Sequence, residues 1–359
     1  MRVTFVLPAP IRVPVGGAAV VYEHAAGLVR RGHTVTVVAP RQTGAGLAAG
    51  ARALAVHVRD RLHGVARASV YSASGVETVE VERVEAATVP PADAVVATGF
   101  QTVAPVLALP LSAGVKVHFV QGDETFVDPD ARAAWRLPFA RVACSPWLAE
   151  AIRAEGGTCL GVVENAVDPE FFACDVEADR PARVLALYHR HPVKGPDVLV
   201  RALRRLYDAR PDVEADVFCA RRPSHRLPKH VRVHVRPDRV ALRGLYAGAA
   251  VFLHTSRSEG WGLTAMEAGA SGCAVIAVQN KGVESVLRCG VSMRCVAPDA
   301  PGADAAAALA LETLDVLAHP DERRRLGRAA RVRTASFRWD DLTSRFESLL
   351  VRAVEGGRP

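Results

Sequence analysis

Two glutamates separated by a glycine-rich turn are the residues of this chain whose types and spacing best suit binding chemistry. Glu259 and Glu267 stand eight positions apart in SEGWGLTAMEAGASGCAVIAV, residues 258–278. The apolar run AVFLHTS, residues 250–256, precedes them and predicts a buried strand. Glu259 should therefore lie in the loop at the carboxyl end of that strand.

The turn between the glutamates predicts an anion site. Gly260 and Gly262 allow the backbone to point its N–H groups inward. A helix should begin near Leu263 or Thr264, where its first amides and its dipole favour negative charge. A diphosphate on those amides, with a hydroxylated ring at Glu259 and another at Glu267, describes a nucleotide-sugar. Two glutamates at this spacing also occur by chance, but the surrounding glycines, strand and helix make the combination more specific.

A lysine is a second candidate for phosphate chemistry. Only four of the 45 basic residues are lysines, and one of them, Lys194, precedes Gly195 in HPVKGPDVLVRAL. The surrounding pattern places it in a loop between a strand and a helix, where its charge could neutralise a departing diphosphate. The alternative is a solvated loop lysine with no such role.

These candidates require a parallel α/β scaffold, because buried strands alternate with amphipathic helices along the whole chain. The expected strands are 2–8, 33–40, 51–58, 92–99, 114–121, 182–190, 213–220, 230–237, 250–256 and 273–278, with one more within 158–172. The expected helices are 16–32, 131–155, 195–210, 239–249, one after the glycines near 263, 304–319, 320–333 and 339–356. Parallel sheets of this kind bind ligands at the carboxyl ends of their strands.

The alternation starts anew near residue 181, which predicts two successive doubly wound domains. We expect an N-terminal, acceptor-side domain over residues 1–172 and a nucleotide-sugar-binding domain over 173–335. A last helix, 336–359, should pack back towards the N-terminal domain. The ligand is expected in the cleft between the domains.

With these elements in view, the chain resembles the family 4 retaining glycosyltransferases, which have the GT-B fold of two Rossmann-like domains. The resemblance rests on the two spaced glutamates and on four further segments. These are VPVGGAAVVYEHAAGLVRRGHTVTVVAP, VVENAVDPEFF, HPVKGPDVLVRAL and FRWDDLTSRFESLL. It covers essentially the whole chain.

The resemblance implies roles for individual residues. The donor-binding residues that it implies are Gly16, Gly17, Glu259, Gly260, Trp261, Gly262, Leu263, Thr264 and Glu267, with Glu267 on the nucleotide ribose. The catalytic residues that it implies are Lys194, Arg190, Glu259 and His118. Enzymes with the GT-B fold generally work without a bound divalent ion, and no metal-ligand spacing is visible in this sequence.

Two positions depart from the family pattern or leave a choice open. The family usually has an arginine five residues before the lysine, where this chain has His189, with Arg190 one step closer. In KVHFVQGDETF, His118 is either a wall residue of a strand or a catalytic group, and Gln121, Asp123 and Glu124 are acceptor-side candidates. That FVQ-x-x-E segment resembles a branch that includes some rhamnosyltransferases.

The function implied is transfer of a hexose-type sugar, with retention of configuration, from a nucleotide-diphosphate donor to a hydroxyl. The acceptor would be a glycan, a lipid-linked compound or a natural product. Two alternatives stay open. One is an epimerase or phosphorylase of the same fold, and the other is a catalytically silent partner subunit.

Composition and charge bear on nucleic-acid binding, membrane insertion and the state of the cysteines. The net charge of +7 comes almost entirely from arginine, and without interleaved aromatic residues or a motif it does not indicate nucleic-acid binding. Residues 94–115 carry no charge, but turn residues divide them into strand, helix and strand rather than a membrane span. The seven cysteines are expected to be buried and reduced, in a cytoplasmic protein that needs no cofactor besides its donor. A weak peripheral contact with a membrane is left open.

Overall fold

The computed structural model describes residues 1–41, 73–176 and 180–357. They form two compact units: Met1–Asn165 together with Trp339–Pro359, and Ala166–Arg338. The chain leaves the first unit a few residues before the expected end at 172. The reason is that the short helix α5 (Pro169–Phe172) packs in the second unit, where the Phe172 and Tyr246 rings lie 5.8 Å apart.

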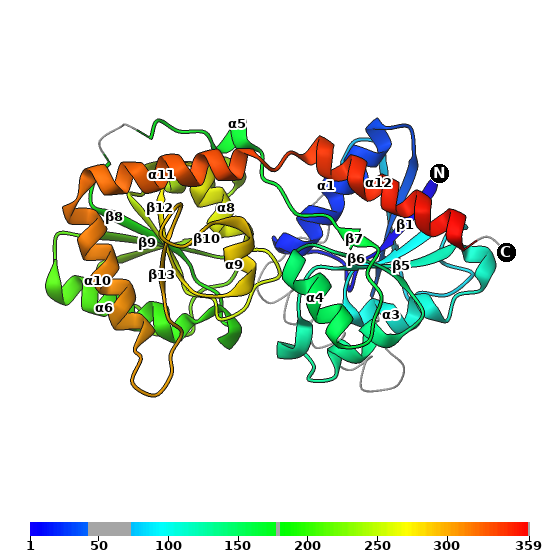
Figure 1. Cartoon of the computed structure of the whole chain (residues 1–359), viewed down its shortest axis with the longest axis horizontal. Coiled ribbons are helices and arrows are strands. Elements are labelled where there is room, and N and C mark those ends of the chain that lie inside the picture. Colours follow the sequence, from blue (N-terminus) through cyan, green and yellow to red (C-terminus); the bar gives the residue numbers. More distant parts are fainter. Residues whose placement is uncertain (42–72, 177–179, 358–359) are drawn as a thin grey trace. The chain divides into compact units, whose positions relative to one another are not determined.

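The described part of the first unit contains one parallel sheet of seven strands, in the order β3-β2-β1-β4-β5-β6-β7 (Figure 1). The strands are β1 (Arg2–Val6), β2 (Thr34–Pro40), β3 (Val76–Val81), β4 (Ala94–Ala97), β5 (Val115–Val120), β6 (Ala140–Ala143) and β7 (Gly161–Val162). The helices are α1 (Gly16–Arg30), α3 (Phe100–Leu107), α4 (Pro146–Ala154) and α12 (Trp339–Gly356), with short 3-10 turns η1 (Leu111–Ala113), η2 (Glu124–Phe126) and η3 (Ala131–Arg136).

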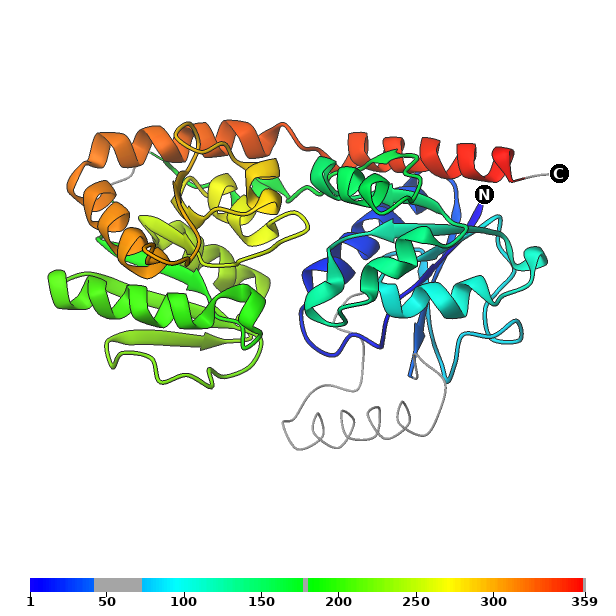
Figure 2. The ribbon, with the colours of Figure 1, turned by 60° about the horizontal axis from the view of Figure 1, so that its bottom comes forward.

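The last helix completes the core of the first unit. Figure 2 shows α12, in red, running along the unit that also contains the blue N-terminal elements. Its Phe346 is fully buried, and its ring lies 6.0 Å from that of Phe5 and 5.1 Å from that of Phe119. Apolar residues at helical spacing thus give α12 one face that fills the gap between α1 and the sheet.

The second unit repeats the doubly wound pattern, with its described strands in the order β10-β9-β8-β11-β12-β13, all parallel. The strands are β8 (Arg183–Leu187), β9 (Glu214–Cys219), β10 (Val231–Val235), β11 (Val251–His254), β12 (Ala274–Val278) and β13 (Arg294–Val296). Besides α5, the helices are α6 (Pro196–Ala209), α7 (Arg239–Gly248), α8 (Leu263–Ala270), α9 (Lys281–Val286), α10 (Ala305–Ala318) and α11 (Pro320–Ala335), and η4 (Pro192–Lys194) is a 3-10 turn.

The core of the second unit lies between its sheet and the helices that cover it. The strands β11 and β12 are buried along their whole length, as their continuous apolar runs require. In Figure 1, α6 packs beside α10, and α8 packs beside α11. Both sheets together bear out the expectation of two Rossmann-like, doubly wound domains.

Two parts of the secondary structure differ from the expectation or were not foreseen, and a third expectation is untested. Residues 131–155, expected to be helical, contain the buried strand β6 between η3 and α4. The short elements β3, β13 and α9 were not foreseen, because three to six residues show too little periodicity. The strand expected at 51–58 lies outside the described residues.

The cysteines are not all reduced, which corrects the expectation. Cys289 and Cys295 are joined by a disulfide across a six-residue separation. Cys289 is exposed in the segment before β13, and Cys295 is half-buried within β13, so neither is a fully buried thiol as the sequence suggested. Cys144, Cys219 and Cys273 are buried thiols, and Cys159 and Cys174 are half-buried thiols.

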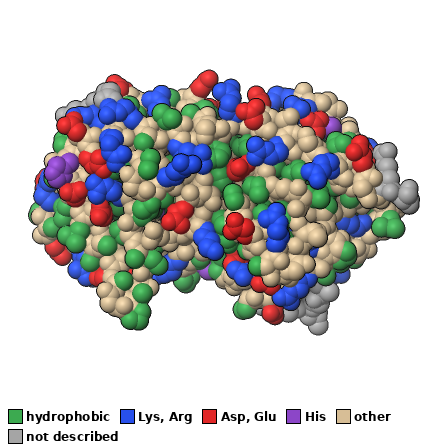
Figure 3. Space-filling model, viewed as in Figure 1, with side chains coloured by type: hydrophobic (Ala, Val, Ile, Leu, Met, Phe, Trp, Pro, Cys, Tyr) green, Lys and Arg blue, Asp and Glu red, His purple; other side chains and the backbone are tan. Residues whose placement is uncertain are grey.

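Charged side chains of both signs are mixed on the face drawn in Figure 3, where blue Lys and Arg groups alternate with red Asp and Glu groups. Many of the arginines form exposed ion pairs, such as Arg210 with Asp212 at 2.6 Å. Within 94–115 the structure has β4, α3 and η1, as expected. Among the described residues, no helix has the length and apolar character needed to cross a membrane.

Candidate functional site

The candidate site of the second unit lies where the strand order of its sheet reverses. Strands β8 and β11 are hydrogen-bonded neighbours in the middle of the sheet. From β8 the chain continues to β9 on one side, and from β11 it continues to β12 on the other side. Lys194 follows β8, and Glu259 follows β11. Ligands of doubly wound sheets bind at this point, outside the carboxyl ends of the strands.

Lys194 and Glu259 form an ion pair at that point. The Lys194 ammonium lies 2.7 Å from Glu259 Oε2, and the two side chains are 25% and 13% exposed. Burial alone would raise the pKa of Glu259, but Lys194 and His254 outweigh it and hold this pKa well below its ordinary value. Glu259 is therefore a carboxylate at neutral pH.

His254, the last residue of β11, lies beside the Glu259 carboxylate. It is buried, and its Nε2 lies 3.6 Å from Glu259 Oε1, which is an electrostatic contact rather than a hydrogen bond. Sequence reasoning did not assign His254. Its position at the end of the strand that leads into the glutamate loop was the available signal.

A close backbone approach explains why glycine follows the lysine. Gly195 has φ +64°, and a Cβ atom built there would lie 2.1 Å from the carbonyl oxygen of Thr255. The Thr255 hydroxyl in turn donates to the Lys194 carbonyl at 2.9 Å. The loop after β8 and the segment after β11 are thus locked together, and any side chain at position 195 would separate them.

The second glycine of the glutamate turn begins helix α8. Gly262 has φ +108° and occupies the N-cap position, and the first α8 hydrogen bond of that turn runs from Met266 N to Gly262 O. The amides before Met266 are not used by the helical ladder and remain the donors for an anion. Gly282, at the start of α9, packs so closely that a Cβ there would lie 2.2 Å from Glu259 O.

Glu267 lies in α8, beside a buried tyrosine that sequence reasoning also missed. Tyr246 of α7 is fully buried and donates to Glu267 Oε2 at 2.8 Å. Burial raises the pKa of Glu267 to about 7, against the opposing effects of Tyr246 and Arg239. The carboxyl group is thus poised between its two protonation states at neutral pH.

Two side chains that the resemblance implies for the site, those of Arg190 and Trp261, make their described contacts away from Lys194 and Glu259. The Arg190 guanidinium donates twice to the Arg222 carbonyl, at 2.9 and 2.6 Å, and no described contact joins it to Lys194 or Glu259. Trp261 is buried, with its ring edge-on to Phe337 and its Nε1 donating to the sulfur of Met266. The Trp261 side chain belongs to the core, so only its backbone can face a donor.

His189 occupies the position where the family has its arginine, and it lies within the electrostatic influence of the ion pair. Burial lowers its pKa, and the nearby charge of Lys194 lowers it further. His189 accepts a hydrogen bond from the His191 amide on Nδ1 at 3.1 Å. A neutral imidazole therefore replaces the permanent charge of an arginine at this position.

The first unit carries its own candidate residues at the carboxyl ends of β1, β4 and β5. Gly16 and Gly17 begin α1, and a Cβ at Gly17 would lie 3.4 Å from Gln121 Oε1. Glu124 accepts from the Phe100 amide at 2.8 Å, and burial raises its pKa to about 7.

Asp123 has a charged partner, whereas both ring nitrogens of His118 are buried without a hydrogen-bond partner among the described residues. Asp123 is held by Arg132 through two hydrogen bonds, of 3.1 and 2.6 Å. His118 is 1% exposed within β5, packs edge-on against the Phe139 ring, and has a pKa lowered by burial to about 3. Whether His118 is a wall residue or a catalytic group stays a prediction to be tested.

Among the described residues, no three His, Cys, Asp or Glu side chains are grouped as ligands of a metal ion. The metal independence inferred from the resemblance stays a prediction, which chelation can test.

Comparison with known proteins identifies relatives for part of the chain. Residues 169–333 match the family described as Glycosyl transferases group 1. The D-inositol 3-phosphate glycosyltransferase of Kribbella flavida is 31% identical over 212 residues, which is 50% of this chain and 47% of the relative. That of Streptomyces coelicolor is 29% identical over 185 residues, 46% of this chain and 39% of the relative. The matches thus span less than half the length of these relatives.

Solved structures resemble the whole chain in fold. Sucrose-phosphate synthase from Thermosynechococcus elongatus superposes with a TM-score of 0.77 at 15% identity, covering 99% of this chain and 100% of that one. Anabaena HepE, crystallised in complex with UDP-glucose, has a TM-score of 0.68 at 15% identity and covers 98% of this chain and 100% of its own. The finer resemblance to a rhamnosyltransferase branch stays a prediction. The chain has the GT-B fold, and its second unit matches the group 1 glycosyltransferases.

Proposed function

We propose that this chain is a retaining glycosyltransferase, which moves a hexose-type sugar from a nucleotide-diphosphate donor to an acceptor hydroxyl without a bound metal ion. The observation that carries the proposal is the convergence of Lys194, Glu259 and the start of α8 at the switch point of the second sheet. The match of residues 169–333 to the group 1 glycosyltransferases supports it.

In this proposal, each part of the donor binds the protein group whose chemistry suits it. The free amides at the start of α8 hold the diphosphate. Glu267 accepts hydrogen bonds from the ribose hydroxyls, and Tyr246 fixes the orientation of that carboxyl group. Glu259, kept charged by its surroundings, accepts from hydroxyls of the donor sugar.

Lys194 links donor binding to the ion pair. A bound diphosphate would compete with Glu259 for the Lys194 ammonium, which lies 2.7 Å from the carboxylate. As Lys194 turns towards the phosphate, Glu259 loses one partner and gains the sugar hydroxyls, while His254 stays beside it. The lysine then stabilises the charge that grows on the leaving diphosphate.

The transfer step needs no protein nucleophile. The acceptor oxygen attacks the anomeric carbon from the face that the diphosphate leaves, as the bond between that carbon and the phosphate oxygen breaks. The acceptor proton passes to an oxygen of the leaving diphosphate. The protein contributes mainly by positioning the reactants and stabilising charge.

The comparisons suggest which substrates to test first. HepE was crystallised with UDP-glucose, so UDP-hexoses come first among donors. The curated relatives are named for D-inositol 3-phosphate, so a phosphorylated polyol comes first among acceptors, followed by glycans, lipid-linked compounds and natural products with free hydroxyls.

A donor panel measured by thermal shift tests the binding half of the proposal, because a ligand that binds the folded state raises its melting temperature. The transfer half is tested by incubation with donor and acceptor, with NMR of the product's anomeric configuration. Retained configuration and a loss of turnover in Lys194→Ala support the proposal. An inverted product, or turnover of the donor without acceptor, contradicts it.

One observation favours the silent-subunit alternative. Arg190, the arginine nearest to the family's position, is bound to the Arg222 carbonyl, and His189 stands in its place. Tight donor binding without transfer to any acceptor would decide for that alternative.

A further inference from the structure

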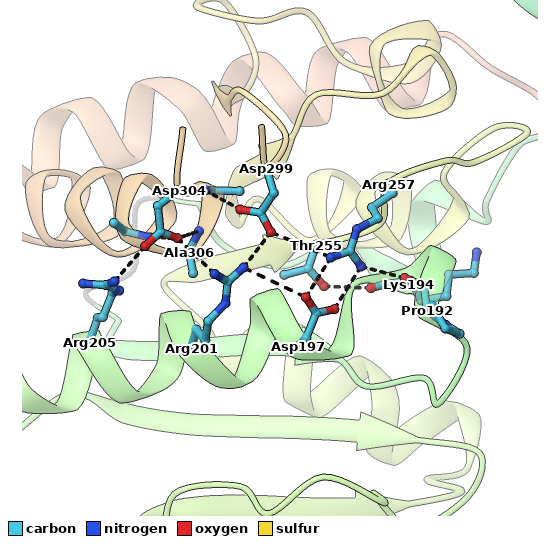
Figure 4. A network of polar contacts seen from close by, with 12 residues as sticks. Pro192, Lys194, Asp197, Arg201, Arg205, Thr255, Arg257, Asp299, Asp304 and Ala306 are labelled. Atoms are coloured by element: carbon cyan, nitrogen blue, oxygen red, sulfur yellow. Dashed lines mark hydrogen bonds and ion pairs between the residues drawn. The ribbon is translucent and has the colours of Figure 1, made fainter. Parts of the chain in front are cut away.

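An arginine outside the sequence motif ties the Lys194 loop to the Glu259 loop. Arg257 lies two residues before Glu259, and its backbone amide donates to the Val193 carbonyl at 2.7 Å. Its guanidinium donates to the Pro192 carbonyl at 2.7 Å and to both oxygens of Asp197, at 2.9 and 2.7 Å. Figure 4 shows the contacts of the Arg257 guanidinium with Pro192 and Asp197.

The contacts bracket the lysine along the chain. Pro192 and Val193 come directly before Lys194 in η4, and Asp197 lies in the first turn of α6, directly after it. The Thr255 hydroxyl adds a bond to the Lys194 carbonyl itself. The backbone of Lys194 therefore cannot shift relative to the Glu259 loop without breaking a contact made by the segment 255–257.

The guanidinium is itself held by a longer network. Asp299 lies 3.8 Å from Arg257 and 2.6 Å from Arg201 of α6. At the far end, Arg205 pairs with Asp304 at 2.7 Å, next to the start of α10 and away from the lysine loop, as Figure 4 shows. The network offers two kinds of ion pair for comparison, one that touches the lysine loop and one that does not.

We infer that Arg257 is a positioning residue for sugar transfer, which sets the place of the Lys194 ammonium by clamping the backbone on both sides of it. This inference rests on the proposed function. Ion pairs as exposed as these contribute little to overall stability. A displacement of about 1 Å in a group that stabilises a transition state can still cost on the order of 10²-fold in rate.

The test compares Arg257→Ala with Arg205→Ala, which removes an ion pair of the same network without touching the lysine loop. We expect Arg257→Ala to lower kcat on the order of ten- to a hundredfold with a melting temperature close to the parent. Arg257→Lys should recover only part of this loss. Lysine keeps the positive charge, but its ammonium cannot bind Asp197 through two parallel hydrogen bonds. Arg205→Ala should keep the parental kcat, and an equal loss there would overturn the inference.

A double mutant separates positioning from a structural effect. If Arg257 acts through Lys194, then Arg257→Ala should change kcat less than about twofold once Lys194 is already alanine. A full additional loss in that background would show that Arg257 acts by another route, and parental kcat in the single variant would refute the inference.

A readout that needs no activity keeps this inference distinct from the proposed function. The chain has only four lysines, so ¹³C-dimethylation gives few NMR signals, with Lys116, Lys229 and Lys281 as references. The Lys194 signal should shift in Arg257→Ala and stay in place in Arg205→Ala. That result with no sugar transfer in the parent would refute the proposed function alone. An unshifted signal with active parent enzyme would refute the inference alone.

Discussion

Replacing Glu267 by glutamine should make the protein more stable and bind its donor less well. The substitution keeps an oxygen that can accept from the Tyr246 hydroxyl, now 2.8 Å from Glu267 Oε2. It removes a carboxyl group whose pKa is raised by burial to about 7. Both effects follow from that shift, and both depend on pH.

The stability effect can be worked out from the two pKa values. The unfolded chain releases the Glu267 proton near the ordinary value of 4.5, whereas the folded chain holds it up to about 7. The folded state therefore binds more protons in this window, so its stability falls as the pH rises from 4.5 to 7. The full difference is about 3 kcal/mol, which is an upper bound because Glu267 as a whole residue is only half-buried. The glutamine variant should escape this loss, with its advantage complete above pH 7 and absent below 4.5.

Donor affinity should change with pH in the opposite direction to stability, rising as Glu267 ionises. An ionised carboxylate accepts hydrogen bonds from ribose hydroxyls more strongly than a protonated carboxyl group or an amide does. Donor affinity of the parent should therefore weaken about tenfold between pH 8 and pH 6, as Glu267 takes up its proton. The variant should bind weakly at both pH values, with no such slope.

Urea unfolding at pH 5 and pH 8, together with calorimetric titration of UDP-glucose, measures both effects. Glu124→Gln is the matched control, because the pKa of Glu124 is also raised by burial to about 7, but in the first unit. It should change the pH dependence of stability and leave that of donor affinity alone. Parallel stability profiles for Glu267→Gln and the parent, or an unchanged slope of donor affinity, would show that Glu267 is not the buried ribose acceptor described above.

Further predictions concern the lysine loop and the metal. Lys194→Ala should lower kcat about 10²–10³-fold in a transfer assay and should weaken donor binding by a smaller factor. A parental rate would refute the role of Lys194. Lys194→Arg should rescue only part of that loss, because the guanidinium is longer and planar. Gly195→Ala should destabilise the chain by more than about 1 kcal/mol in urea unfolding, since its Cβ would lie 2.1 Å from Thr255 O and its φ is +64°; equal stability would contradict the close approach. Sugar transfer should survive EDTA, and activity restored only by added metal would show that a cation binds the diphosphate.

The fold could be predicted from the sequence because its information is local. Apolar runs such as AVIAV in β12 and the amphipathic spacing of α6 mark buried strands and covering helices without reference to the rest of the chain. β6 was missed because it has four residues, includes Arg141, and lies between two helical segments. Arg141 is nevertheless buried, and backbone carbonyls such as Phe139 O accept hydrogen bonds from the terminal nitrogens of its guanidinium.

The candidate site was predicted less completely, because side-chain direction depends on contacts across the fold. The sequence placed Lys194 and Glu259 in loops after two different strands, but their ion pair appears only once β8 and β11 are neighbours. Trp261 looked like a donor contact within its motif, whereas its ring fills a gap beside α8. Arg257 belongs to no motif, and the positioning role proposed for it rests on contacts such as the one with a carbonyl 65 positions away.

The return of α12 to the first unit has a consequence for the order of folding. Residues Ala166–Arg338 form a continuous unit, whereas the first unit needs Phe346 from the end of the chain to cover Phe5 near its beginning. During synthesis, the second unit can therefore complete its core while the first still lacks its final helix. Domains usually fold in the order in which they leave the ribosome. Here the first unit cannot complete its core until α12 has been synthesised, so the side of its sheet around Phe5 and Phe119 stays uncovered until then.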